Sequence, residues 1–245
     1  MGKTYEALKR AEAEFGEKLL TRRAERHIKS PPPRQTKDER DQEQYEALKH
    51  SLLTNYPVES LRSIILTGTA FGDGSSNTSV NLAVAMAQEA WRSILLIDAD
   101  LRHPSLHEAF TLPVGKGLFD YLADESVSAP QLNKIKDNLH LLTAGSFETN
   151  SAGLLDSTRF DDLLHDMEAR FNHVIIDCPP VTMFSETRVV ASKADGVVLV
   201  LNAGKTRKNV AVTAKQILQE SNAQILGVAL NRRQFYIPEW IYKKV

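Results

Sequence analysis

The stretch "SIILTGTAFGDGSSNTSVNLAVAMAQEA", residues 63–90, decides the fold. It starts with a short apolar run, passes through a loop that contains Gly72 and Gly74, and ends in a segment with a helical pattern. This order of strand, glycine-bearing loop and helix is the layout of a phosphate-binding loop, G-x-x-x-x-G-K-[ST]. In such a loop the backbone N–H groups and the N-terminus of the helix bind phosphate oxygens.

The match to this motif is incomplete at two positions. Ser76 stands where the magnesium-binding hydroxyl belongs, but Thr69 replaces the first glycine and Ser75 replaces the lysine. No lysine or arginine lies between Arg62 and Arg92. Taken by itself, the loop sequence is compatible with a phosphate site but favours an ordinary turn between a strand and a helix.

The rest of the chain predicts an α/β fold, a parallel sheet with helices on both faces. The apolar runs that predict strands are Ile64–Thr67, Ile94–Ile97, Leu139–Leu142, Val174–Ile176, Val197–Leu201 and Ile225–Leu230. Helical patterns at 76–90, 158–170, 186–193 and 207–220 separate most of them. Near-continuous apolar strands that alternate with helices are typical of a parallel sheet that is covered on both sides. Such sheets bind ligands beyond the C-terminal ends of their strands.

Carboxylates stand at two of these strand ends. Asp98 closes the strand in "ILLIDADLRHP", Asp100 follows two residues later, and Asp177 closes the strand in "VIIDCPP". Carboxylates at such a position can hold a cation or orient a nucleophile, although capping of the strand end remains an alternative. Together with the glycine loop they favour a nucleotide site.

Net charge, cysteine count and the length of the apolar runs exclude several classes of protein. The chain has 245 residues and a formal net charge of −1, so we expect no general binding of nucleic acid. A lone cysteine, Cys178, excludes an internal disulfide. No apolar run approaches the roughly 18–20 residues that span a bilayer. We therefore expect a cytoplasmic protein that reaches a membrane only through a partner.

Several blocks resemble one family, the bacterial tyrosine kinases of capsular and exopolysaccharide biosynthesis. The resemblance covers residues 43–234 and rests on "NLAVAMAQ", "LLIDADLRHPSLH", "GLFDYLADE", "FNHVIIDCPPV", "ADGVVLVLNAGKTRKNV" and "ILGVALNRR". The family consists of P-loop NTPase-like proteins related to partition and septum-site ATPases. The resemblance sets the bounds of a P-loop tyrosine-kinase-like domain (43–234), which an aromatic tail (235–245) follows. Before it, apolar residues at helical spacing and then a proline-rich, charged composition predict an N-terminal helix and a linker (1–42).

The resemblance also implies a site for ATP or ADP with Mg²⁺. The cofactor-binding positions that it implies are Gly72, Asp73, Gly74, Ser75, Ser76, Asn77 and Asn231, the last of these at the adenine. It places Mg²⁺ at Ser76, Asp98 and Asp177, and makes Asp98 and Asp100 the catalytic carboxylates, with Asp98 near the incoming tyrosine hydroxyl.

Partners follow from the resemblance as well. Its members dock on the cytosolic part of a membrane-embedded polysaccharide chain-length regulator, which implies recruitment to the inner face of the cell membrane. Self-association is possible, but Glu46 reverses a charge of the family's oligomerisation helix, E-x-x-R-x-x-R. Tyr236 and Tyr242 are phospho-acceptor candidates, and the apolar residues around them favour a docking segment. The helix expected at 3–29 is either solvated or a second docking element.

The serine at position 75 decides between activities. Without the lysine we expect a regulatory protein that binds nucleotide weakly and has little or no kinase activity. The alternative is an active tyrosine autokinase that uses ATP and Mg²⁺ with a substitute cation. A partition-type ATPase scaffold is a further alternative, which Ala70 disfavours because those proteins carry a signature lysine there.

Overall fold

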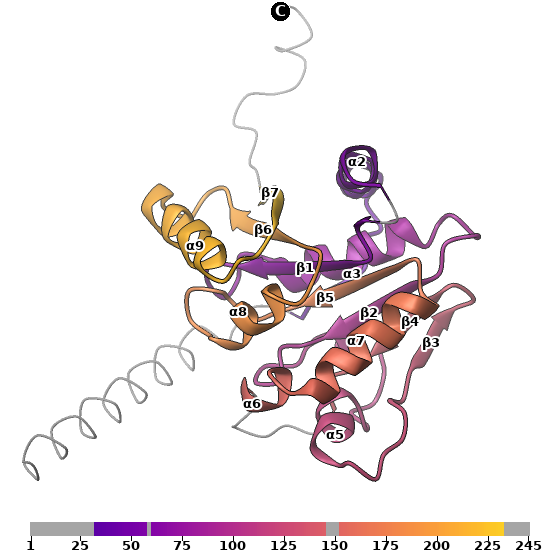
Figure 1. The fold of residues 1–245 in the computed structure, drawn as a ribbon. Coiled ribbons are helices and arrows are strands. Elements are labelled where there is room, and N and C mark those ends of the chain that lie inside the picture. Colours follow the sequence, from indigo (N-terminus) through magenta and orange to yellow (C-terminus); the bar gives the residue numbers. More distant parts are fainter. Residues whose placement is uncertain (1–31, 58–59, 146–151, 233–245) are drawn as a thin grey trace, which may run out of the picture. The chain divides into compact units, whose positions relative to one another are not determined.

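The computed structural model of the chain describes residues 32–57, 60–145 and 152–232 (Figure 1). The helix expected at 3–29 and the tail with Tyr236 and Tyr242 lie outside these residues. Among the described helices, none is both long enough and apolar enough to cross a bilayer.

A seven-stranded sheet forms the centre of the described part, in the order β3-β4-β2-β5-β1-β6-β7. Its strands are β1 (Ser63–Gly68), β2 (Ile94–Asp98), β3 (Asn133–Lys136), β4 (Leu139–Leu142), β5 (His173–Asp177), β6 (Gly196–Asn202) and β7 (Ile225–Asn231). All neighbours are parallel except β3, which runs antiparallel to β4. The six expected strands are confirmed. The seventh, β3, is a short edge strand whose sequence, "NKIK", contains no apolar run.

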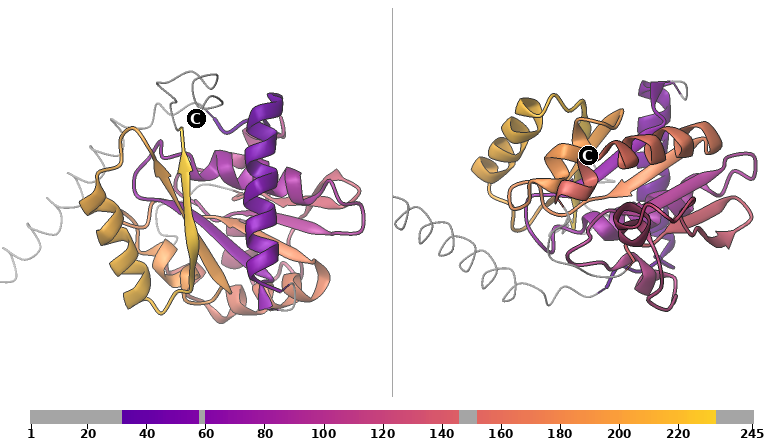
Figure 2. Two further views of the ribbon diagram at one scale, coloured as in Figure 1. Left: turned by 90° about the horizontal axis from the view of Figure 1, so that it is seen from above. Right: turned by 60° about the horizontal axis from the view of Figure 1, so that its bottom comes forward.

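Helices cover both faces of the sheet, as the fold class predicted (Figures 1 and 2). They are α2 (Glu39–Asn55), α3 (Ser75–Met86), α4 (Leu106–Ala109), α5 (Leu118–Ala123), α6 (Ala152–Leu155), α7 (Thr158–Arg170), α8 (Glu186–Ala191) and α9 (Lys208–Glu220). One apolar cluster joins α2 and α3 to the sheet, and the other joins α5, α7 and α9 to its opposite face.

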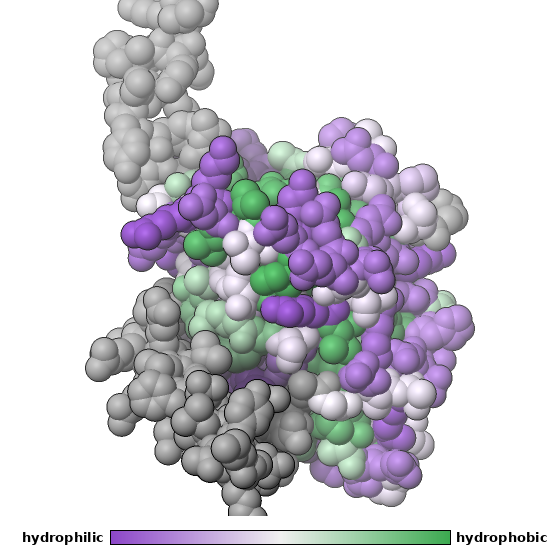
Figure 3. All heavy atoms as spheres, turned by 60° about the vertical axis from the view of Figure 1, so that its left-hand side comes forward, coloured by the Kyte–Doolittle hydropathy of each residue, from purple (hydrophilic) through white to green (hydrophobic). Residues whose placement is uncertain are grey.

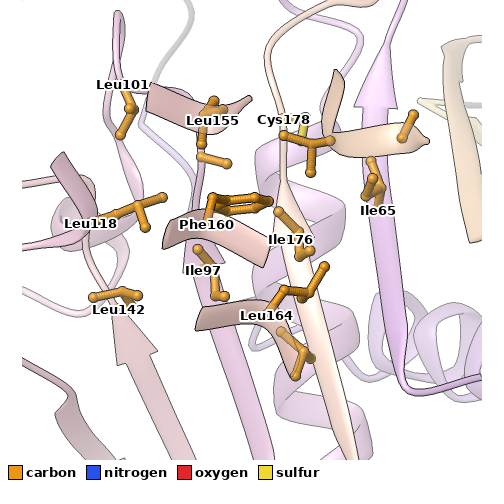
Figure 4. Close-up of a cluster of buried hydrophobic side chains, with 14 of the residues drawn as sticks. Ile65, Ile97, Leu101, Leu118, Leu142, Leu155, Phe160, Leu164, Ile176 and Cys178 are labelled. Atoms are coloured by element: carbon orange, nitrogen blue, oxygen red, sulfur yellow. The ribbon is translucent and has the colours of Figure 1, made fainter. Parts of the chain in front are cut away.

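The second cluster forms the larger core (Figure 4). Ile97 and Ile176 project from neighbouring strands toward Phe160 and Leu164 of α7, and all four are buried. Because each central strand is buried on both faces, it reads as a continuous apolar run instead of an alternating one.

The helix α2 begins at Glu39, so the last residues of the region 1–42 are helical. The side chain of Asp38 accepts a hydrogen bond from the Arg40 N–H and caps this helix. N-terminal to this cap, the backbone of residues 32–38 lies against α3, and we call this segment the strap.

Two asparagines of α3 hold the strap. The Arg34 N–H donates to Oδ1 of Asn77 at 3.0 Å, and the Thr36 N–H donates to Oδ1 of Asn81 at 2.7 Å. Nδ2 of Asn81 donates to the Arg34 carbonyl at 2.9 Å. A proline-rich extended chain leaves its backbone groups free, so it can be bound by amide side chains in this way.

Replacing Asn81 with alanine should release the strap at one point. The Thr36 N–H would lose its acceptor, so we expect its hydrogen exchange to accelerate by about tenfold, the equivalent of one net hydrogen bond. The variant also loses the bond from Asn81 to the Arg34 carbonyl, so the internal control is the Val174 amide, which donates to the Arg62 carbonyl away from the strap and should keep its protection. Hydrogen exchange followed by NMR measures both amides. Equal exchange of the Thr36 amide in the parent chain and in Asn81→Ala would show that this bond does not form in solution.

Candidate nucleotide site

The loop between β1 and α3 has the backbone of a phosphate-binding loop. Gly72 and Gly74 have φ values of +86° and +94°, a region that favours glycine. At Gly74 a Cβ would also lie 1.9 Å from Nδ2 of Asn231, so a side chain there would displace the amide that donates to the Asp73 carbonyl. The helix α3 begins directly afterwards at Ser75, and its N-cap residue, Gly74, offers no side chain to the first N–H groups. These free donors and the helix dipole suit an anion.

Asp73 holds this loop in shape. Its Oδ2 accepts hydrogen bonds from the N–H groups of Thr69 (2.8 Å) and Ala70 (3.0 Å) and from the Thr69 hydroxyl (2.7 Å). Its Oδ1 accepts one from the Thr206 hydroxyl at 3.2 Å. The carboxylate is therefore turned toward the start of the loop, and the Asp73 N–H donates to the Ala70 carbonyl at 3.2 Å, so contact of Asp73 with nucleotide stays a prediction.

The two asparagines predicted at the site also contact protein groups. Nδ2 of Asn77 donates to the Tyr45 hydroxyl at 3.3 Å, and its Oδ1 binds the strap. Nδ2 of Asn231 donates to the Asp73 carbonyl at 3.0 Å, so the end of β7 supports the loop. Contact of either residue with nucleotide stays a prediction.

The structure brings the three predicted carboxylates together beside the loop. Strands β2 and β5 are neighbours, and their register places Asp98 opposite Asp177. Oδ2 of Asp98 accepts from the N–H groups of Ser105 (3.1 Å) and Leu106 (3.0 Å). Oδ1 of Asp100 accepts from the His103 N–H at 3.0 Å.

Only one carboxylate oxygen of Asp177 has a hydrogen-bond partner among the described residues. Its Oδ1 accepts from the Ser79 hydroxyl of α3 at 2.9 Å, whereas its Oδ2 is buried and has no hydrogen-bond partner among the described residues. A buried carboxylate oxygen without a donor is costly unless a cation binds it.

Burial dominates the electrostatics of this cluster. It raises the pKa of Asp98 to about 7; the carboxylate of Asp100 adds to the rise, and the Leu106 N–H opposes it. Burial likewise raises the pKa of Asp100, against the effect of a positive charge on His103. The pKa of Asp177 lies well above its ordinary value because of burial and the neighbouring Asp98. Perturbed carboxyl groups of this kind concentrate at functional sites.

The site fits a magnesium ion that is held mainly by phosphate and water. In the described part of the chain, no group of three or more histidine, cysteine or acidic side chains could hold a metal. Mg²⁺ usually keeps several waters and takes one or two protein ligands in addition to substrate phosphates. Oδ2 of Asp177 and the hydroxyl of Ser76, the residue after Ser75 at the start of α3, would be those ligands.

Arg102, in the loop after β2, is already engaged. Nε of Arg102 lies 2.6 Å from Oε1 of the buried Glu186, so its charge is used within the protein. Above this pair, the rings of Phe71, His103 and Phe184 meet from the loops that follow β1, β2 and β5, with centroids 4.9–6.1 Å apart.

Sequence reasoning missed several residues that shape the site. Ser79 could have been found, because it lies one helical turn after Ser75 on the helix that opens at the loop. Nothing in the sequence pairs Thr206 with Asp73, since 133 positions separate them. The three rings were missed for the same reason.

Comparisons with known proteins agree with this geometry. The family model of the ATPase MipZ matches residues 62–206. The tyrosine-protein kinase YwqD of Bacillus subtilis is 35% identical over 194 residues, which are 78% of this chain and 81% of that protein. The putative tyrosine-protein kinase CapB of Staphylococcus aureus is 27% identical over 191 residues, 78% of this chain and 83% of that protein.

The crystal structure of the chimerical protein CapA2B2 superposes with a TM-score of 0.72 at 29% identity, and the match covers 83% of this chain and 94% of that one. Fold and sequence thus agree, and the chain belongs to the bacterial tyrosine-protein kinases, within the P-loop ATPases.

Proposed function

We propose that this chain is a nucleotide-binding regulator of capsular or exopolysaccharide biosynthesis, in which phosphoryl transfer is weakened because Ser75 replaces the loop lysine. The observation that carries the proposal is the buried cluster of Asp98, Asp100 and Asp177 beside a loop in which Gly72 and Gly74 have positive φ and no lysine is present. The names of CapB and the CapA2B2 chimera support the pathway. Control of polymer chain length or export is the role we infer.

The loop would hold the phosphates of ATP or ADP through the N–H groups of Gly72 and of residues 74–76 at the start of α3, whereas the Asp73 N–H already donates to the Ala70 carbonyl. Ser76 and Asp177 would hold Mg²⁺, which would supply positive charge to the phosphates, and Asp98 lies opposite Asp177 on the neighbouring strand. Asp98, whose pKa lies at about 7, is suited to take the proton of a tyrosine hydroxyl at neutral pH. Asp100 would assist by keeping that pKa high.

The missing lysine weakens both binding and transfer. One charge-assisted hydrogen bond contributes about 1.5–3 kcal/mol, so affinity for ATP should be about tenfold to 100-fold lower than with lysine. Losing a preorganised charge at the transferred phosphoryl group costs about 100-fold to 1,000-fold in rate. Arg102 cannot easily compensate, because Glu186 holds its charge. An active autokinase is the alternative, and it would need a substitute cation from a partner or from elsewhere in the chain.

For its location, we propose a cytoplasmic protein that the cytosolic part of a membrane-embedded chain-length regulator recruits to the inner face of the membrane. Self-association through α2 would have to use side chains of this helix that form no ion pair within the same chain. Lys49 is paired within the chain, since its Nζ lies 2.5 Å from Glu46 and 3.3 Å from Glu89. The exposed Glu43 remains available to another copy.

Restoring the lysine should restore affinity. Ser75→Lys should bind Mg-ATP about tenfold to 100-fold more tightly, because the ammonium regains its phosphate contact. Titration calorimetry measures the change. Thr213→Lys is the matched control, since it adds the same charge on the exposed side of α9. Unchanged affinity in Ser75→Lys would mean that the loop has lost its geometry as well as its charge.

Kinase activity should be weak and should depend on the same lysine. The purified chain incubated with Mg-ATP should give little phosphotyrosine on a blot, and Ser75→Lys should give about 100-fold more. Adding Asp98→Ala to that variant should remove the signal. A strong signal in the parent chain that disappears in Asp98→Ala would overturn the weakened-kinase proposal in favour of an active autokinase. Tyr236→Phe and Tyr242→Phe would then locate the acceptor.

The acidic cluster also predicts how stability depends on pH. The native pKa of Asp98 is about 7, above the unfolded value of about 3.9, so the native state keeps its proton longer and loses stability as pH rises between these values. Asp98→Asn removes this titration. As pH rises from 5 to 8, the parent chain should therefore lose about 3 kcal/mol of free energy of unfolding that Asp98→Asn does not lose.

Urea denaturation at the two pH values measures this difference. Asp137→Asn is the control, because Asp137 is fully exposed and its pKa is lowered by Lys134, so it should show no such difference. A pH-independent difference between Asp98→Asn and the parent would show that Asp98 is ionised across this range.

A further inference from the structure

The edge strand β7 has one face that the described residues leave open. Its register pairs Val228 with Leu199 and Leu230 with Leu201. Leu199 and Leu201 belong to the apolar cluster on the α9 side, and residues paired across neighbouring strands point to the same face. Yet Val228 and Leu230 are 54% and 60% exposed.

A groove runs beside these two side chains, between β7 and α9. Its volume is about 580 Å³, and its apolar lining includes Ile225, Val228, Ala211 and Val212. Val212 is itself 45% exposed. On the face that carries α9, Figure 3 shows apolar surface lying among polar side chains.

The rim of the groove is basic. Lys208 and Lys215 of α9 line it, and neither forms an ion pair with another described residue. The alkyl stems of such lysines extend the apolar surface while their ammonium groups stay in water.

The opposite face of β7 is covered. The Tyr56 hydroxyl at the end of α2 donates to the Leu226 carbonyl at 3.3 Å, and Leu226 and Ala229 pack into the cluster of α2 and α3. An edge strand that is covered on one side and apolar on the other is a surface that proteins usually protect.

We propose that residues 233–245 of the same chain fold back into this groove. They follow β7 directly, and Arg232 at the junction has φ +56°, a left-handed conformation found where a strand reverses direction. Thirteen residues reach at most about 45 Å, about twice the length of β7, so the segment can return along the groove. Its apolar side chains, Phe235, Ile237, Trp240 and Ile241, would cover Val228 and Leu230.

This docking gives the tail a role that is independent of nucleotide chemistry. While the tail lies in the groove, Tyr236 and Tyr242 are kept from other chains. A partner that uses the tail must first compete with the groove.

Trp240 offers a direct test. The chain has two tryptophans, and the other, Trp91, is 66% exposed, so Trp91→Phe leaves Trp240 as the only indole at small cost. In this background we expect blue-shifted emission and protection from acrylamide quenching. Adding Val228→Glu should red-shift the emission and lower the equilibrium constant for docking at least about tenfold, because a carboxylate is costly to bury against the apolar side chains of the tail. Val114→Glu, at a site 73% exposed, is the matched control and should change neither reading.

Three results would overturn the proposal: Trp240 fully quenchable in the Trp91→Phe background, quenching unchanged by Val228→Glu, or the same change caused by Val114→Glu. Protection that appears only at high protein concentration, with a doubled mass in sedimentation, would assign the groove to the tail of a second copy and also overturn it. Far-ultraviolet circular dichroism checks whether Val228→Glu still folds. If it does not, Leu230→Ser, a milder change beside the groove, replaces it and should show a smaller change in the same direction.

Discussion

The geometry of the nucleotide site depends on the carboxylate of Asp73. It gathers two backbone N–H groups and two hydroxyls, and so fixes the path of the chain between β1 and α3. Gly68 leaves room for it, because a Cβ there would lie only 3.0 Å from the Cβ of Asp73. With the loop fixed in this way, the donors at the start of α3 are preorganised for an anion. This framework needs no lysine, which explains how the loop can persist with a serine at position 75.

The carboxylates opposite the loop set the second constraint. Asp98 and Asp177 are adjacent because β2 and β5 are neighbours in register, and both are buried. In most sites of this kind, positive charge from a lysine and a metal balances such a cluster. Here the described residues supply no lysine at the loop, and burial of the three carboxyl groups raises their pKa values.

The sequence predicted those strands and site residues that a short stretch of neighbouring residues is enough to identify. Buried parallel strands appear as apolar runs, and Asp98 and Asp177 stand out because each directly follows such a run. What escaped prediction depends on contacts between distant segments. The short strand β3 forms because β4 offers it an edge, the strap is ordered by Asn77 and Asn81, and neither feature has a local pattern. The roles of Asn77 and Asn231 in supporting the loop became visible only with their neighbours in place.

The strap connects the N-terminal part of the chain to the first turns of the helix that opens at the loop. Arg34 and Thr36 are bound by side chains only two and six residues after Ser75. Any molecule that peels the strap away must break these bonds, and any change in the first turn of α3 on nucleotide binding alters them. By thermodynamic linkage the two events affect each other equally, so a protein that pulls on the N-terminal segment would tune nucleotide affinity without touching the nucleotide.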